Sequence, residues 1–75
     1  MNEPIYVVTG RKRDDRQRYA LTDKTTDYKM IRELVPFVSK RLLPLFSNIR
    51  VNRVYPGKEL PTYDTSALLS APKNN

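Results

Sequence analysis

The sequence of 75 residues contains no cysteine, no histidine and no tryptophan, and only two glycines. Without cysteine and histidine there is no disulfide bond, no thiolate nucleophile, no imidazole acid or base, and no zinc site of the usual ligand types. Two glycines far apart in the chain do not build a phosphate-cradling loop. These absences exclude most familiar enzyme mechanisms, so we predict a binding protein that is not an enzyme and needs no cofactor.

Long apolar runs are also missing. The longest one near the N-terminus, Ile5–Val8, is too short for a signal-peptide core. Nothing approaches the roughly 20 apolar residues of a membrane span. The sequence therefore predicts a soluble cytoplasmic protein with neither a membrane partner nor a small-molecule substrate.

Positive charge is what the sequence has in excess. Lys and Arg number 14 against 8 Asp and Glu, which gives a net charge of +6, and 39% of the residues are hydrophobic. A chain of this length has room for one small domain with a modest core. A strongly basic small domain is typical of proteins that bind negatively charged partners.

Two short segments rich in β-branched or aromatic residues, Ile5–Thr9 and Arg18–Thr22, predict a hairpin. Residues 10–17 between them include no apolar side chain, so we expect a solvated loop there. A third strand is predicted at Ile49–Tyr55. Its alternation of apolar and polar residues breaks at Val54, which a β-bulge near Asn52 and Arg53 would explain.

Capping side chains at Thr25, Thr26 and Asp27 predict the start of a helix. Because an interior proline removes a helical hydrogen bond, we expect a kink at Pro36 or a second helix that starts there. Pro44 should end the helical region, with Ser47 and Asn48 in the following turn. One apolar stripe recurs at spacings of three and four along this segment: Ile31, Leu34, Val35, Val38, Leu42 and Leu45.

The order strand, strand, helix, strand predicts an α+β fold over residues 1–58. We expect a small three-stranded antiparallel sheet with one long helix packed on one face. Residues 59–75 carry two prolines and one apolar cluster. They predict an extended or partly disordered C-terminal tail.

The predicted loop between the first two strands is the densest basic feature. A basic loop on a hairpin can lie along phosphates, and its binding then weakens steeply with salt. Alternatively, Asp14 and Asp15 partly neutralise the loop, which is then simply solvated. Both interpretations stay open for its five basic residues: Arg11, Lys12, Arg13, Arg16 and Arg18.

A second basic region lies around the third predicted strand, because no acidic residue occurs from Leu34 through Lys58. We predict that its side chains bind a partner through charge and an exposed aromatic ring. A tyrosine on a small sheet can instead complete the core, with its hydroxyl at the rim. The predicted partner-binding residues are Arg50, Arg53, Tyr55 and Lys58.

Within this region, Val51–Pro56 has the form V-x-R-V-x-P. It resembles the closing strand of the small proteins by which some lytic bacteriophages inhibit the RNA polymerase of their host, and the element order and chain size are similar. The resemblance implies a positive patch that grips the polymerase β′ jaw and blocks open-complex formation. Arg53 matches the first important arginine of that family, whereas Tyr55 stands where a second arginine is expected. Other small phage regulators bind around the RNA exit channel and promote read-through of terminators.

We therefore hypothesise a non-enzymatic transcription regulator of phage type. It would bind bacterial RNA polymerase in the host cytoplasm and inhibit initiation, promote antitermination, or do both. RNA or DNA backbone is a further expected partner. Two alternatives stay open: a nucleic-acid-binding module that recognises the phosphate backbone, and an inhibitor of another host protein.

Overall fold

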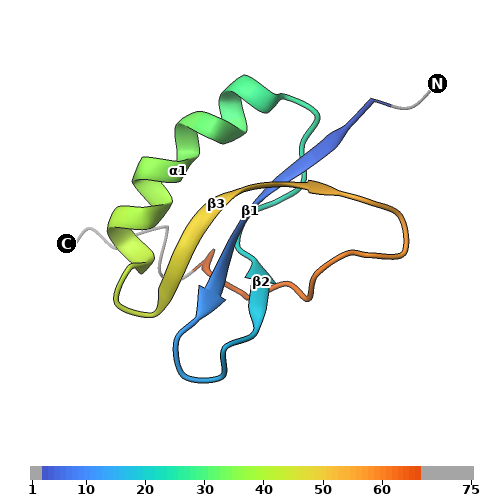
Figure 1. Cartoon of the computed structure of the whole chain (residues 1–75). Coiled ribbons are helices and arrows are strands. Elements are labelled where there is room, and N and C mark those ends of the chain that lie inside the picture. The colour runs from blue at the N-terminus through green and yellow to red at the C-terminus, as the bar shows by residue number, and fades with distance from the viewer. Residues whose placement is uncertain (1–2, 67–75) are drawn as a thin grey trace.

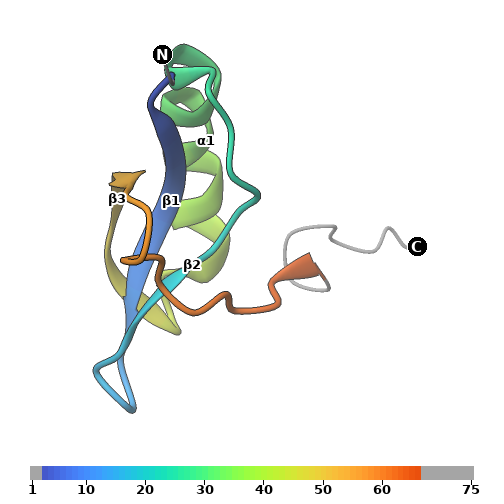
Figure 2. The same ribbon diagram turned by 90° about the vertical axis from the view of Figure 1, so that its right-hand side faces the viewer.

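The computed structural model of the chain describes residues 3–66, in which three strands and a helix form two layers. Strands β1 (Ile5–Lys12), β2 (Arg18–Ala20) and β3 (Phe46–Val54) make one antiparallel sheet in the order β2-β1-β3. Helix α1 (Tyr28–Leu42) connects β2 to β3 and packs against β1 and β3 (Figures 1 and 2). The predicted α+β fold is confirmed: a small antiparallel sheet with a helix on one face.

The predicted start of the helix is confirmed. The Asp27 carboxylate accepts a hydrogen bond of 3.0 Å from the backbone N–H of Met30, as an N-cap residue does. The helix then continues through Pro36, so the prediction of a second helix there is wrong. Pro36 is exposed, where water can hydrogen-bond the carbonyl of Arg32 that lacks a helical donor.

The core lies between α1 and the sheet. Leu45, which we predicted to be part of the apolar stripe, lies in the turn after the helix and is exposed. Because the helix ends at Leu42 and β3 begins at Phe46, the Phe46 side chain is buried in its place. The buried core residues are Val8, Leu21, Ile31, Val38, Leu42 and Phe46.

Strand β3 is longer than predicted and contains Ser47 and Asn48, which we had expected in a turn. Its register with β1 is continuous from the Ile5–Val54 pair to the Thr9–Arg50 pair, so the bulge predicted near Asn52 and Arg53 is wrong. The irregularity lies further back, between Thr9 and Arg11 of β1, and is opposite Asn48. Asn48 has a φ of 53°, a conformation that asparagine tolerates better than most residues.

Strand β1 extends past its predicted end at Thr9 because Gly10 lets the neighbouring strands and core side chains approach closely. A Cβ atom built on Gly10 would lie 2.9 Å from Cδ1 of Leu21 and 3.1 Å from Cγ1 of Ile49. The predicted solvated loop of residues 10–17 therefore shrinks to residues 13–17, while Arg11 and Lys12 belong to the strand.

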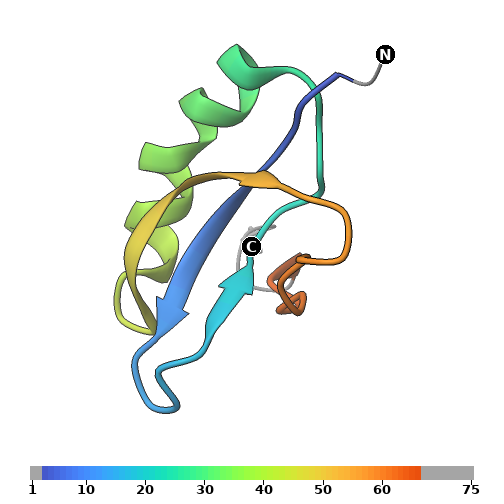
Figure 3. The same ribbon diagram turned by 45° about the vertical axis from the view of Figure 1, so that its right-hand side comes forward.

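After β3 the chain makes a wide loop and returns to the edge of β2 (Figures 1 and 3). There Ala20 donates its backbone N–H to Pro61 at 2.9 Å and accepts one from Tyr63 at 3.0 Å. The buried hydroxyl of Thr65 donates to the carbonyl of Leu21 at 2.8 Å. The packed body thus extends beyond residue 58, where we had placed its end, because residues 61–65 complete the edge of β2. The rest of the predicted tail, residues 67–75, lies outside the described residues.

Candidate functional site

The sheet has one face under α1 and a second face, here called the open face, that is turned away from α1. Side chains alternate between the two faces along each strand. Because Val8 of β1 packs in the core beneath α1, its neighbours Val7 and Thr9 belong to the open face. The register then adds Arg50 opposite Thr9, and Arg18 opposite Arg11. Each of the three strands thus contributes one arginine to the same face.

Arg18 is held across the sheet by two hydrogen bonds. Its Nη1 donates to Oγ1 of Thr9 at 2.6 Å, and its Nη2 donates to the backbone carbonyl of Asn48 at 3.0 Å. The bulge at Asn48 is therefore part of the site, since it supplies this carbonyl. A guanidinium has five N–H donors, so this anchoring leaves others for a ligand.

Arg11, Arg18 and Arg50, here called the arginine cluster, repel one another. Burial, followed by the positive charges of Arg50 and Arg11, lowers the pKa of Arg18. Within residues 3–66 no carboxylate lies within ion-pair distance of the cluster, because the salt bridge found there joins Lys12 to Asp14. A gathering of like charges without a counter-charge is stabilised by a bound anion.

The other basic residues of the predicted loop do not join this cluster. Lys12 is paired with Phe46 and so lies on the helix side. Its Nζ contacts both carboxylate oxygens of Asp14 at 2.6 Å and lies 5.8 Å from the ring centroid of Tyr63. The hydrogen bond to Asp14 raises the pKa of Lys12. Arg13 donates its Nε to the carbonyl of Leu43 at 3.0 Å, after the end of α1.

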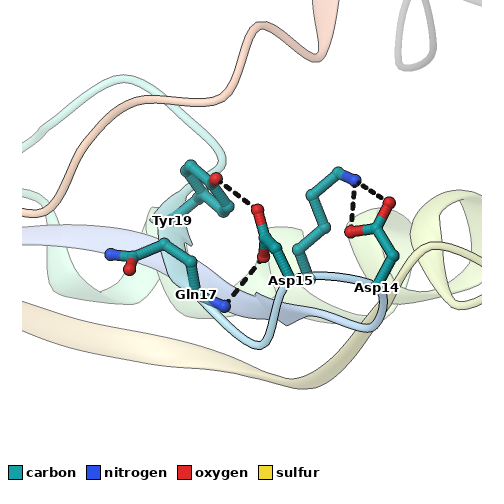
Figure 4. Close-up of polar contacts among 5 residues, drawn as sticks. Asp14, Asp15, Gln17 and Tyr19 are labelled. Atoms are coloured by element: carbon teal, nitrogen blue, oxygen red, sulfur yellow. Dashed lines mark hydrogen bonds and ion pairs between the residues drawn. The ribbon is translucent and has the colours of Figure 1, made fainter.

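Residues 13–17 are ordered by local hydrogen bonds. Asp15 accepts the hydroxyl of Tyr19 at 2.7 Å and the backbone N–H of Gln17 at 2.8 Å (Figure 4). These two bonds, the first more than the second, lower the pKa of Asp15. Arg16 is exposed in this loop with a φ of 61°. The five predicted basic residues thus divide: Arg11 and Arg18 join the arginine cluster, and the other three have separate surroundings.

The four predicted partner-binding residues are likewise divided. Arg53 lies three positions after Arg50 in a stretch of regular register, so the two side chains belong to opposite faces of the sheet. The Arg53 guanidinium lies 5.2 Å from the ring centroid of Tyr55, and both residues are exposed. Lys58 lies on the loop that follows β3, where its backbone N–H donates to the carbonyl of Tyr55 at 2.9 Å.

A cavity of about 170 Å³ adjoins the open face, between the sheet and the returning loop. Thr9, Asn52 and Arg53 are its polar residues on the sheet. The Thr9 hydroxyl donates to Oδ1 of Asn52, and Oγ1 of Thr9 accepts from Arg18, so the cavity and the arginine cluster share one hydrogen-bond network. Its other lining residues are Val7, Ala20, Thr22, Asp23, Lys24, Val54, Lys58, Glu59, Leu60 and Thr62.

Thr9, Asn48 and Asn52 are the site residues that sequence reasoning missed. Thr9 is fully buried although it lies on the face without a helix. The alternation of Arg50 and Asn52 was visible in the sequence and placed both on one face. Only the pairing of β1 with β3 shows that Thr9 lies between them and Arg18.

Comparison with known proteins gives no match: no family model, no curated protein and no solved structure is similar to this chain at the threshold of significance. Among the described residues, no group of three or more acidic side chains could hold a metal ion. In the same part of the chain, no helix combines the length and apolar character that crossing a bilayer requires.

Proposed function

We propose that this chain is a non-enzymatic module that binds the phosphate backbone of nucleic acid on the open face of its sheet. The arginine cluster carries the proposal: three strands each place an arginine on one face, without a carboxylate at ion-pair distance in the described region. A phosphate bound there relieves the repulsion within the cluster. Each phosphate contact also releases condensed counterions, which favours binding at low salt.

Arginine is better suited than lysine to bind a phosphate group. Its planar fork donates two parallel hydrogen bonds to one phosphate, and it is less strongly hydrated than lysine. Arg18 is already oriented by Thr9 and Asn48, so it loses little conformational freedom on binding. The less constrained Arg11 and Arg50 flank it.

The direct test uses fluorescence anisotropy with a labelled oligonucleotide at low salt. We expect Arg50→Glu to weaken binding more than about tenfold, because it removes a phosphate contact and adds a repulsive charge. The matched control is Arg41→Glu, which makes the same charge change on α1, where Arg41 lies over the ring of Phe37. Equal losses in the two variants would show that only net charge matters and would contradict the proposal.

A second candidate function is regulation of bacterial transcription by docking on RNA polymerase, as an inhibitor of initiation or an antitermination factor in the bacterial cytoplasm. The exposed pair of Arg53 and Tyr55 favours it, since the pair lies at the end of β3 within the V-x-R-V-x-P motif. A stacked arginine and tyrosine form the kind of contact that dominates protein interfaces. The Arg53 side chain belongs to the opposite face from Arg50, and Arg53 also lines the cavity beside the open face.

Retention on immobilised bacterial polymerase after nuclease treatment separates the two candidates. Polymerase docking predicts that Arg53→Glu abolishes retention and leaves the circular dichroism spectrum unchanged, whereas Arg50→Glu has little effect. Undiminished retention of Arg53→Glu would rule out the motif as the docking surface. No retention of the wild-type chain would rule out polymerase docking.

A further inference from the structure

The cavity beside the arginine cluster has no part in backbone binding alone. We propose that it receives one nucleobase of a single-stranded nucleic acid whose phosphates lie on the arginine cluster. This inference rests on the proposed function and deepens it, because it makes single strands, and not duplexes, the ligand.

The size of the cavity fits one aromatic ring. Its volume is about 170 Å³, and a cavity of about 150 Å³ in a protein core is known to accept benzene. Ligand sites for drug-sized molecules are larger, from about 300 Å³ upward. In a duplex the bases are stacked and paired inside the helix, whereas a single strand can turn a base outward into such a space.

The lining combines apolar walls with a polar floor, as a nucleobase requires. Val7, Val54 and Leu60 offer apolar surface to the two faces of a ring. The Asn52 amide offers hydrogen bonds to its edge: Oδ1 accepts from Thr9, and within residues 3–66 Nδ2 has no hydrogen-bond partner. An asparagine amide has both a donor and an acceptor, which is the pattern that base edges present.

The charges around the cavity differ from those of the arginine cluster. Lys24, Arg53 and Lys58 line the cavity together with Asp23 and Glu59, so its formal charge is only +1, whereas the arginine cluster has three positive charges and, within residues 3–66, no carboxylate at ion-pair distance. A phosphate is therefore bound more favourably at the cluster, and the uncharged base more favourably in the cavity. Electrostatics thus orient a nucleotide in one direction.

Thr9 connects the two subsites. Its hydroxyl oxygen accepts from Arg18 on the phosphate side and donates to Asn52 on the base side. Because Arg18 and Asn52 both contact the Thr9 hydroxyl, the proposed phosphate and base subsites lie next to each other. We therefore expect the base and the phosphate of one nucleotide to be bound together.

The deciding experiment compares two labelled single strands of about 12 nucleotides, within the usual site size. One is oligothymidylate, and the other has the same phosphates with abasic sugars. We expect the wild-type chain to bind the strand with bases about tenfold more tightly, the usual contribution of one well-held base. Equal affinities that both depend on Arg50 would overturn this inference and leave the proposed function standing. If neither strand binds, the proposed function itself fails.

Filling the cavity tests where the base is held. Ala20 lines the cavity and is nearly buried, so Ala20→Leu places new side-chain volume inside it. We expect the variant to bind oligothymidylate only as tightly as the abasic strand, with its abasic affinity unchanged. The unchanged abasic affinity is the internal control for folding. A preserved preference for bases would contradict the cavity assignment.

If Ala20→Leu does not fold, Asn52→Leu replaces it, because it removes the polar floor at similar volume. Here the readout is the ratio of the two affinities within the variant, which we expect to fall to about one, and a preserved preference for bases would again contradict the cavity assignment. Free thymidine monophosphate is the competitor that separates a nucleotide site from a strand site. We expect it to compete only at concentrations at least about a hundredfold higher, since it offers one phosphate in place of several. Competition at equal concentrations would reassign the cavity to a free nucleotide.

Discussion

The two faces of the sheet are built from the same strands but differ in their side chains: apolar residues fill the helix-covered face, and arginines gather on the open face. The helix-covered face buries Val8 and Phe46 beneath α1. The open face has the buried hydroxyl of Thr9 at its centre and gathers Arg18 and Arg50 around it. The first face supplies stability through apolar burial, and the second holds unneutralised charge that contributes little to stability. A function that depends on charge is therefore expected on the face that the core does not use.

Removal of Phe46 should have the largest effect on stability, because its side chain is fully buried between the sheet and the helix. Phe46→Ala is expected to lower the free energy of unfolding by about 3–5 kcal/mol, measured by urea denaturation. The matched control is the second phenylalanine of the chain, Phe37, which is 45% exposed on α1. Phe37→Ala should cost less than about 1 kcal/mol. Similar costs for the two variants would contradict the assignment of the core to this face.

Gly10→Ala also tests the close packing on the helix-covered face, but it adds a methyl group, whereas Phe46→Ala removes a side chain. Its new methyl group would meet Leu21 and Ile49 at 2.9 and 3.1 Å, so these side chains must shift. We expect a loss of about 1–3 kcal/mol in the free energy of unfolding, typical of overpacking. Oligonucleotide affinity should stay within about twofold, since Gly10 is on the face away from the arginine cluster. A stable variant that no longer binds would show that the two faces are not independent.

Acid should weaken the loop between β1 and β2. The hydrogen bond from Tyr19 lowers the pKa of Asp15, so this stabilisation is present above the ordinary aspartate pKa of about 3.9 and is lost as the pH falls through and below that value. Tyr19→Phe keeps the ring that packs against Phe46 and Tyr63 and removes the hydroxyl. The difference in urea midpoint between wild type and variant should thus be larger at neutral pH than near pH 3. A difference in urea midpoint that does not change with pH would show that the hydrogen bond from Tyr19 to Asp15 is not its cause.

Removal of an arginine from the cluster should have the smallest effect on stability. Arg50 is exposed, lacks an ion-pair partner in the described region and is repelled by Arg18. Arg50→Ala is expected to change the free energy of unfolding by no more than about 0.5 kcal/mol, by thermal denaturation. Lys12→Ala is the comparison, because it breaks an ion pair and a contact with Tyr63 on the other face. A loss of more than about 1 kcal/mol in Arg50→Ala would mean that Arg50 is a structural residue.

Local patterns were enough to predict the fold but not the site. Capping at Asp27 and the spacing of Ile31, Val38 and Leu42 are determined within a few residues, and they predicted the helix correctly. The arginine cluster depends on register instead. A shift of one position at Asn48 decides which side chains of β1 and β3 face one another, and no local pattern in the sequence indicated it.

The same limit explains why the structure separates some of the residues that the sequence placed in one group. Arg50 and Arg53 are close in sequence, but an odd separation along a regular strand places them on opposite faces. Arg11 and Arg18 are distant from Arg50 in sequence and meet it through strand pairing. Counts of basic residues along the chain cannot make this distinction, because charge clusters form in space.

The central claim, that the open face binds phosphates through the arginine cluster, is tested most directly by the salt dependence of single-strand affinity. For the double variant Arg11→Ala/Arg50→Ala, we predict that the slope of log K against log salt concentration becomes shallower by about 1.4, or about 0.7 for each lost phosphate contact. The control Lys40→Ala/Arg41→Ala removes the same charge from the last turn of α1 and should leave the slope unchanged. Equal slopes for the wild type and the cluster variant would contradict the claim.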